Sequence, residues 1–256
     1  MPDTMTEFSL RPQPTPERPL AGVTMLVVED SRFACEALRQ LCLASGARLR
    51  RADCLASARR HLRLYRPDVV LVDLGLPDGP GEELIAELHR ARPRIAAIMG
   101  ISGDPSVAVA ALAAGADDFL EKPIASLAAF QNSIAKSLGG PARPRLAKAG
   151  TPATPDAMAL HDDLNQAARM LANRPDATGR SYLARFLTGV ARSTDDSDLA
   201  DAARALAETG GEGDERRARL EALVRARLAT CGAEFAPPRQ VESLSGRPVP
   251  VARAQA

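Results

Sequence analysis

Four short apolar segments of this chain each run into side chains that suit phosphoryl chemistry. In chain order, these side chains are the acid pair Glu29 and Asp30, then Asp73, Ser102 and Lys122. Strands of an open parallel sheet deliver such groups to one edge, at the carboxyl ends of the strands, where binding sites form. A set of carboxylates, a hydroxyl and an amine at that edge fits a metal-assisted phosphoryl acceptor.

The chemistry of this set follows from its charges. Three carboxylates repel one another, and a hard divalent cation such as Mg²⁺ relieves that repulsion. Asp73 could then attack an activated phosphoryl group as a nucleophile. The metal and Lys122 would neutralise the oxygens of the transferring group, and Ser102 could donate a hydrogen bond to the product.

A regular alternation of strands and helices must position these groups. Apolar runs predict strands at 23–28, 47–52, 69–73, 95–101 and 117–120. Helical periodicity lies between them, at about 31–45, 55–65, 80–91, 105–114 and 126–138. The pattern predicts an α/β fold, a (βα)5 doubly wound parallel sheet covered on both faces. Glu29 and Asp30 meet Asp73 if the strand order is flavodoxin-like, 2-1-3-4-5.

Residues 22–140 resemble the receiver domain of two-component response regulators. The resemblance implies that Asp73 is the phosphoacceptor and that Glu29 and Asp30 are the acidic metal-binding pair. It also implies the following roles: Gly75 as a backbone-carbonyl metal ligand, Ser102 as the switch hydroxyl, Phe119 as the switch aromatic, Lys122 as the invariant lysine, and Pro123 after a cis peptide. Ser102 stands at a position where Thr is more frequent in the family. Gly75 stands at a position where a larger residue is usual, and this difference would alter the dephosphorylation rate.

The same resemblance implies a function and partners. The chain would be a response regulator, phosphorylated by a histidine kinase or a phosphotransfer protein, with Mg²⁺ as cofactor. It would not be an enzyme, beyond weak self-phosphorylation and autodephosphorylation. A degenerate receiver that no longer accepts phosphate is an alternative, although no position of the site is missing.

One face of the predicted receiver has few charges. The predicted helix 105–115 has no charged residue, and the exposed side of helix 126–137 carries only Lys136. Exposed helix faces normally carry charges, so this face, built by the fourth helix, fifth strand and fifth helix (the 4-5-5 face), is predicted to bind a second copy or an output partner. An Ala-rich sequence that simply lacks charge is the alternative.

Composition excludes several classes of protein. The formal net charge of +1 gives no electrostatic case for nucleic acid or a membrane surface. The cysteines form no CxxC pair and complete no zinc pattern with the histidines. No apolar run reaches the roughly 18 residues of a membrane span. A cytoplasmic protein is expected.

The chain is expected to divide into a disordered leader, the receiver, a linker, a helical output or dimerisation module, and a disordered tail. The expected bounds are 1–20, 21–140, 141–155, 156–235 and 236–256 respectively. Predicted helices of the module cover 156–172, 180–193, 196–208 and 214–230. They form either a separate bundle or a layer packed on the receiver.

The helical module has no motif that names its function. Residues 157–234 contain 11 Arg against 13 acidic residues, and the module has no basic recognition helix, so DNA binding is not expected. The exception is His161, which is followed by Asp162 and Asp163, as in the phosphoacceptor box of some histidine kinases. The alternative function is therefore a phosphorelay intermediate in which His161 exchanges phosphoryl with an aspartate. Ordinary packing of a helical bundle would also explain a histidine there.

Overall fold

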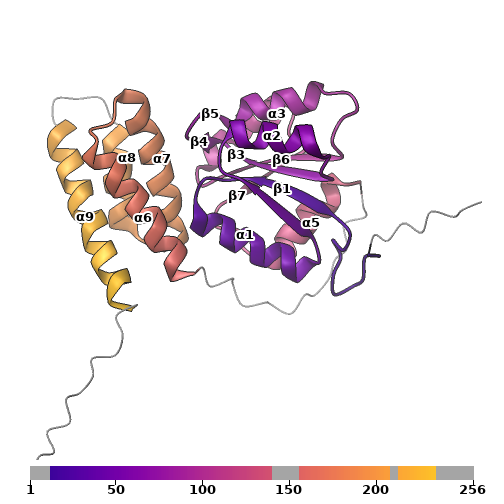
Figure 1. The fold of residues 1–256 in the computed structure, drawn as a ribbon, viewed down its shortest axis with the longest axis horizontal. Coiled ribbons are helices and arrows are strands. Elements are labelled where there is room, and N and C mark those ends of the chain that lie inside the picture. Colours follow the sequence, from indigo (N-terminus) through magenta and orange to yellow (C-terminus); the bar gives the residue numbers. More distant parts are fainter. Residues whose placement is uncertain (1–11, 140–155, 208–212, 235–256) are drawn as a thin grey trace, which may run out of the picture.

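The computed structural model describes residues 12–139, 156–207 and 213–234. Within these residues a parallel five-stranded sheet has the order β2-β1-β3-β6-β7, with helices on both faces (Figure 1). Its strands are β1 (Thr24–Val28), β2 (Arg48–Ala52), β3 (Val69–Asp73), β6 (Ala97–Ser102) and β7 (Asp118–Glu121). Counted along these strands, the order is the predicted flavodoxin-like 2-1-3-4-5. The predicted fold class is therefore confirmed.

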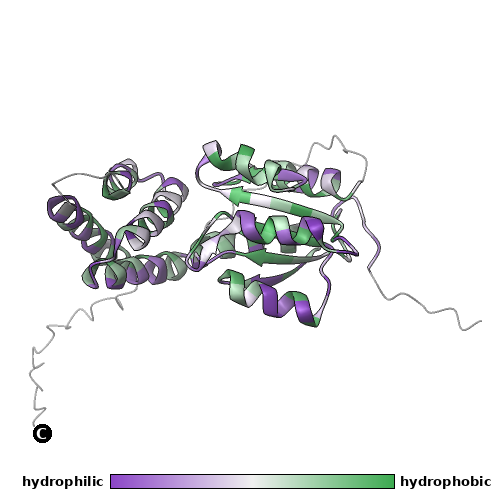
Figure 2. Ribbon diagram, turned by 90° about the horizontal axis from the view of Figure 1, so that it is seen from above, coloured by the Kyte–Doolittle hydropathy of each residue, from purple (hydrophilic) through white to green (hydrophobic). Residues whose placement is uncertain are grey.

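Side-chain alternation along the strands builds a core on each face of the sheet. Leu26 and Val28 point into one core, whereas Met25 and Val27 point into the other. The first core packs against α2 (Leu55–Leu64), α3 (Gly81–Arg90) and α4 (Ala108–Ala113), and the second against α1 (Arg32–Ser45) and α5 (Leu127–Ser137). Because both faces are covered, the central strands are apolar throughout. Figure 2 shows them as hydrophobic ribbons between amphipathic helices.

Two local features were not predicted. The short strands β4 (Gly75–Leu76) and β5 (Gly79–Pro80) form a small antiparallel hairpin directly after β3. The fourth helix is shorter than expected, because a 3₁₀ turn, η1 (Pro105–Val107), replaces its first turn. Pro105 fits such a turn, since it has no backbone N–H to donate.

The second half of the described chain is a helical region. Its helices are α6 (Ala157–Ala172), α7 (Ala177–Ser193), α8 (Ser197–Ala207) and α9 (Gly213–Glu234). They enclose a hydrophobic core of their own, to which Leu164, Leu183 and Leu220 contribute. No described helix is both long enough and apolar enough to cross a membrane.

The helical region packs directly on the sheet domain. Contacts join α6 and α7 to α1, and α7 to β4, so α7 faces the carboxyl ends of the strands (Figure 1). The helices therefore enclose a core of their own and also contact the sheet domain.

Three expected segments need comment. Residues 1–11 of the expected leader, all of the expected linker (141–155) and all of the expected tail (236–256) lie outside the described residues. The expected leader, 1–20, extends too far along the chain, because Leu20 is 2% exposed and packs into the core that α1 covers. The backbone N–H of Leu20 donates to the carbonyl of Ser45.

Candidate functional site

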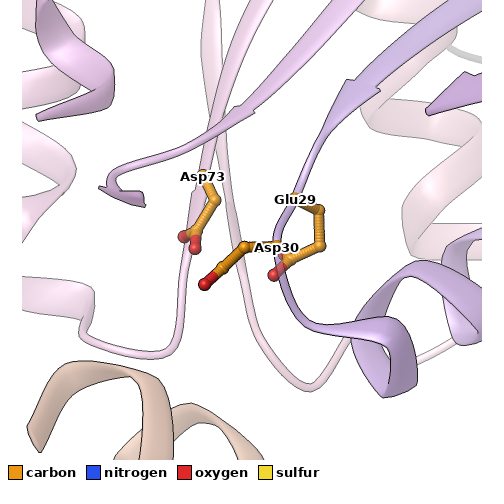
Figure 3. Close-up of side chains that lie close together, drawn as sticks. All are labelled: Glu29, Asp30 and Asp73. Carbon is orange, nitrogen blue, oxygen red and sulfur yellow. The ribbon is translucent and has the colours of Figure 1, made fainter. Parts of the chain in front are cut away.

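Three carboxylates meet at the carboxyl edge of the sheet. Glu29 and Asp30 follow β1, Asp73 ends β3, and the two strands are neighbours in register. One oxygen from each carboxylate lies within 4.8 Å of the others (Figure 3). All three side chains are buried. The predicted strand order places strands 1 and 3 side by side, and this adjacency brings the three acids together.

Lys122 is the cation of this cluster. Its Nζ donates a 2.8 Å hydrogen bond to Glu29 Oε2 and lies 3.3 Å from Asp73 Oδ1. Burial alone lowers the pKa of Lys122, but the charges of Asp73 and Glu29 outweigh it and hold that pKa above its usual value. Lys122 is therefore a permanent positive charge beside Asp73.

One ammonium does not balance three carboxylates. Burial, aided by the neighbouring carboxylates, raises the pKa of Glu29 to about 8 and that of Asp30 to about 6. Burial is the larger cause of both shifts, and the repulsion between the carboxylates, which a cation would relieve, adds to it. Closely grouped carboxylate oxygens are also the ligands that Mg²⁺ prefers, so the donor set fits this ion.

The remaining predicted positions lie around the acids. Gly75 and Ser102 line the same cavity as Asp73, and Ser102 Oγ accepts a 3.1 Å hydrogen bond from the Asp104 N–H. The Lys122–Pro123 peptide is cis. Phe119 is half-buried and packs beside Gly100, where an added Cβ would lie 3.2 Å from the Phe119 ring. Phe119 does not line the cavity.

This arrangement has a counterpart among known families. Residues 25–133 match the model of the response regulator receiver domain. Residues 25–133 are a receiver domain. The matched segment ends before α6 begins, so it says nothing about the helical region.

Curated relatives match less than half of this chain. The KDP operon transcriptional regulatory protein KdpE of Escherichia coli K12 is 35% identical over 99 residues, covering 39% of this chain and 44% of its own length. A protein-glutamate methylesterase/protein-glutamine glutaminase of Myxococcus xanthus is 35% identical over 112 residues, covering 41% and 32% respectively. This chain thus spans less than half the length of the curated relatives it matches.

Solved receiver structures resemble this domain as well. The signal receiver domain of a signal transduction histidine kinase from Syntrophus aciditrophicus has 27% sequence identity and a TM-score of 0.42. The alignment covers 49% of this chain and 97% of that one.

The helical region closes one side of the acceptor site. A cavity of about 320 Å³ lies between the receiver domain and α7, and all three acids line it. Its far wall comes from α7, including Arg185, Thr188 and Gly189. An added Cβ on Gly103 of the receiver domain would lie 3.2 Å from Gly189 Cα, so the two backbones approach closely here.

A tyrosine of α7 contacts Asp30. The Tyr182 hydroxyl donates a short hydrogen bond to Asp30 Oδ2 and accepts one from the Gln166 side chain. Burial, together with the charge of Asp30, raises the pKa of Tyr182, so the hydroxyl stays protonated and donates. Tyr182 was not singled out from the sequence, because nothing local marks a tyrosine that contacts Asp30 from so far along the chain.

An aspartate of α6 caps a helix of the receiver domain. Asp163 is fully buried and accepts hydrogen bonds from Ser31 Oγ (2.6 Å), the Arg32 N–H (2.9 Å) and the Phe33 N–H (3.1 Å). These groups form the first turn of α1, whose N–H groups have no partners within the helix. Next to it, Asp162 forms a 2.6 Å ion pair with Arg32 at the surface.

His161 lies at the start of the same motif but plays no part in this contact. It is half-buried, and its Nδ1 lies 3.0 Å from Asn165 Nδ2 on the next turn of α6. It does not line the cavity around Asp73. The two acids that follow His161 in the sequence therefore contact the receiver domain. The resemblance of this motif to the phosphoacceptor box of histidine kinases did not predict that contact.

Proposed function

We propose that this protein is a cytoplasmic response regulator that accepts a phosphoryl group on Asp73 and thereby changes how its own helical region docks. The observation that carries the proposal is the cluster of Glu29, Asp30 and Asp73 beside the Lys122 ammonium, in a receiver domain. Mg²⁺ would bind the three carboxylates and the Gly75 carbonyl, and would supply charge neutralisation during transfer.

The residues around the acceptor have separate roles in this proposal. Lys122 holds positive charge beside Asp73, where the transferred phosphoryl group gains negative charge. Ser102 turns its hydroxyl toward the phosphoryl group, and Phe119 moves inward with it. Ser102 ends β6, which pairs with β3, and Phe119 lies in β7, which pairs with β6. A shift there reaches the 4-5-5 face, which we keep as a candidate homodimer or output surface. Val109 (76% exposed) and Leu112 (49% exposed) on α4 give this face apolar contact area.

The interaction that switches is proposed to be the docking of α6 and α7. Tyr182 bonds a metal-binding acid, and α7 walls the cavity around Asp73, so any charge added at Asp73 acts on groups of the helical region. A ligand that interacts differently with two states shifts the population between them. A phosphoryl group at Asp73 meets that condition.

The partners proposed are a histidine kinase or a phosphotransfer protein upstream and a protein downstream. The KdpE relative is named as a transcriptional regulator, but its aligned stretch of 99 residues spans less than half of that protein. The helical region has fewer Arg than acidic residues, so we propose a protein target for it and not DNA.

The first test is the intact mass of the chain after incubation with Mg²⁺ and acetyl phosphate, beside Asp73→Asn. One added phosphoryl group in the wild type and none in the variant is the expected result. Hydrogen exchange of α6 and α7 should then differ between the phosphorylated and unphosphorylated wild type. Unchanged exchange would contradict the proposed switch, and no mass increase would contradict the acceptor role.

A further inference from the structure

Arg185 of α7 lies close to Asp73, the proposed acceptor. A Cβ added to Gly75 would lie 3.8 Å from Arg185 Cβ and 3.8 Å from Asp73 Oδ2. The distance from Arg185 Cβ to Asp73 Oδ2 is therefore at most twice 3.8 Å. Arg185 and Asp73 both line the cavity between the receiver domain and α7. A long side chain rooted there can bring its guanidinium to a group carried by Asp73.

This guanidinium is also free. Among the described residues Arg185 has no hydrogen bond or ion pair, and its side chain is exposed. The other arginines near the contact are engaged: Arg51 donates to the backbone carbonyls of Glu29 and Asp30, and Arg192 lies 3.9 Å from Glu121. An unpaired cation on the wall of an acidic cavity is available to bind further negative charge there.

We propose that Arg185 binds the phosphoryl group as it is transferred to Asp73 and afterwards. The inference rests on the proposed acceptor role of Asp73. Guanidinium is suited to this task because its planar donors match two phosphoryl oxygens at once. Gly75 leaves room for the contact, since a side chain there would fill the space between Arg185 and Asp73.

The transfer balances without any further reactant. An Asp73 carboxylate oxygen attacks the phosphorus of acetyl phosphate and forms a new O–P bond. The P–O bond to the acetyl group breaks, and acetate leaves with the electron pair. Arg185 stabilises the charge that spreads over the phosphoryl oxygens, together with Lys122 and the metal.

The contact has a structural consequence. Lys122 belongs to the receiver domain, but Arg185 belongs to α7, so a bond between Arg185 and the phosphoryl group ties the two parts together. Phosphorylation therefore tightens the docking of the helical region.

The test compares Arg185→Met, which keeps the apolar stem and removes the charge, with Arg185→Lys and the control Arg180→Met. Arg180 lies on the same helix, does not line the cavity, and donates to the Pro175 carbonyl instead. The rate of phosphoryl uptake from acetyl phosphate with Mg²⁺ is followed by intact mass. Hydrogen exchange of α7 is measured in each phosphorylated and unphosphorylated form.

We expect Arg185→Met to take up phosphoryl roughly tenfold more slowly than wild type and to lose the added protection of α7. Arg185→Lys should retain part of both effects, and Arg180→Met all of them. Equal rates and equal protection in Arg185→Met and wild type, with both phosphorylated, would overturn this inference alone. A wild-type chain that takes up no phosphoryl would overturn the acceptor role and this inference together.

Discussion

At the scale of single residues, one hydrogen bond at the proposed acceptor site would compete with the binding of a metal ion. Tyr182 donates to Asp30, and Asp30 is one of the three acids grouped within 4.8 Å. An oxygen that accepts a hydrogen bond has less electron density to offer a cation. If Mg²⁺ binds these acids as proposed, the helical region lowers the affinity for that ion.

Tyr182→Phe should bind Mg²⁺ roughly tenfold more tightly than wild type, because a hydrogen bond to a charged group is worth about 1.5–3 kcal/mol and about 1.4 kcal/mol corresponds to a factor of ten. Calorimetric titration with Mg²⁺ measures the change. Tyr65→Phe is the matched control, since the Tyr65 hydroxyl is buried without a partner in the described structure and does not line the cavity. Equal affinities in the two variants would show that the Tyr182 bond does not oppose the metal.

A second residue-scale effect arises where two glycines meet. A Cβ on Gly103 would lie 3.2 Å from Gly189 Cα, whereas a Cβ on Gly189 would meet nothing within 4 Å. We expect Gly103→Ala to push α7 away and to speed hydrogen exchange at the contact. Gly189→Ala should leave docking intact and stabilise α7 by roughly 0.5–1 kcal/mol, as Ala does in place of Gly within helices. The opposite ranking in exchange rates would refute the close approach.

At the scale of elements, α1 begins with help from another part of the chain. Its N-cap Ser31 accepts from the Ala34 N–H and at the same time donates to Asp163 of α6. Asp163 accepts two further N–H groups of the first turn. A carboxylate also suits the positive end of the helix dipole. Hence α1 is fully capped only when α6 is docked.

Asp163→Ala should loosen docking by about 1–3 kcal/mol, because it leaves buried donors at the start of α1 without an acceptor. Faster hydrogen exchange in the first turn of α1 and in α6 would show this. Asp162→Ala is the matched control: it removes only an ion pair between exposed side chains, worth at most about 1 kcal/mol. Equal effects of the two substitutions would argue against the buried cap.

The strands and helices, and the acids they position, could be predicted from the sequence because their signals are local. Alternating and helical patterns mark each element, and strand ends mark Glu29, Asp30 and Asp73. The contacts of Asp163 and Tyr182 could not be predicted, since they join residues separated by 130 or more positions. Only the packing of two separate cores decides which surfaces meet. The local acidic pattern after His161 was visible, but it does not say what the acids contact.

At the scale of the whole molecule, the proposed acceptor role of Asp73 implies that the helical region discriminates phosphodonors by size. A small donor would enter the cavity of about 320 Å³, but a protein donor would have to bring its own histidine to Asp73, close to the position of α7. Under this proposal, transfer from a protein requires the helical region to move away.

Asp163→Ala should accordingly be phosphorylated faster than wild type by a phosphotransfer protein that acts on the wild type. Uptake from acetyl phosphate should not rise, because an undocked α7 no longer offers Arg185. The ratio of the two rates, followed by intact mass, is the measure, with Asp162→Ala as control. A ratio unchanged from wild type would mean that docking does not obstruct the protein donor.

Because the two parts belong to one chain, their contact would exclude kinases that bind the receiver domain only weakly. A tethered surface competes with free partners as if it were present at a concentration on the order of mM. A kinase that recognises the receiver domain weakly cannot displace α7, whereas one that binds tightly can. Under the proposed function, the buried cap at Ser31 would set a threshold of affinity below which a kinase does not reach Asp73.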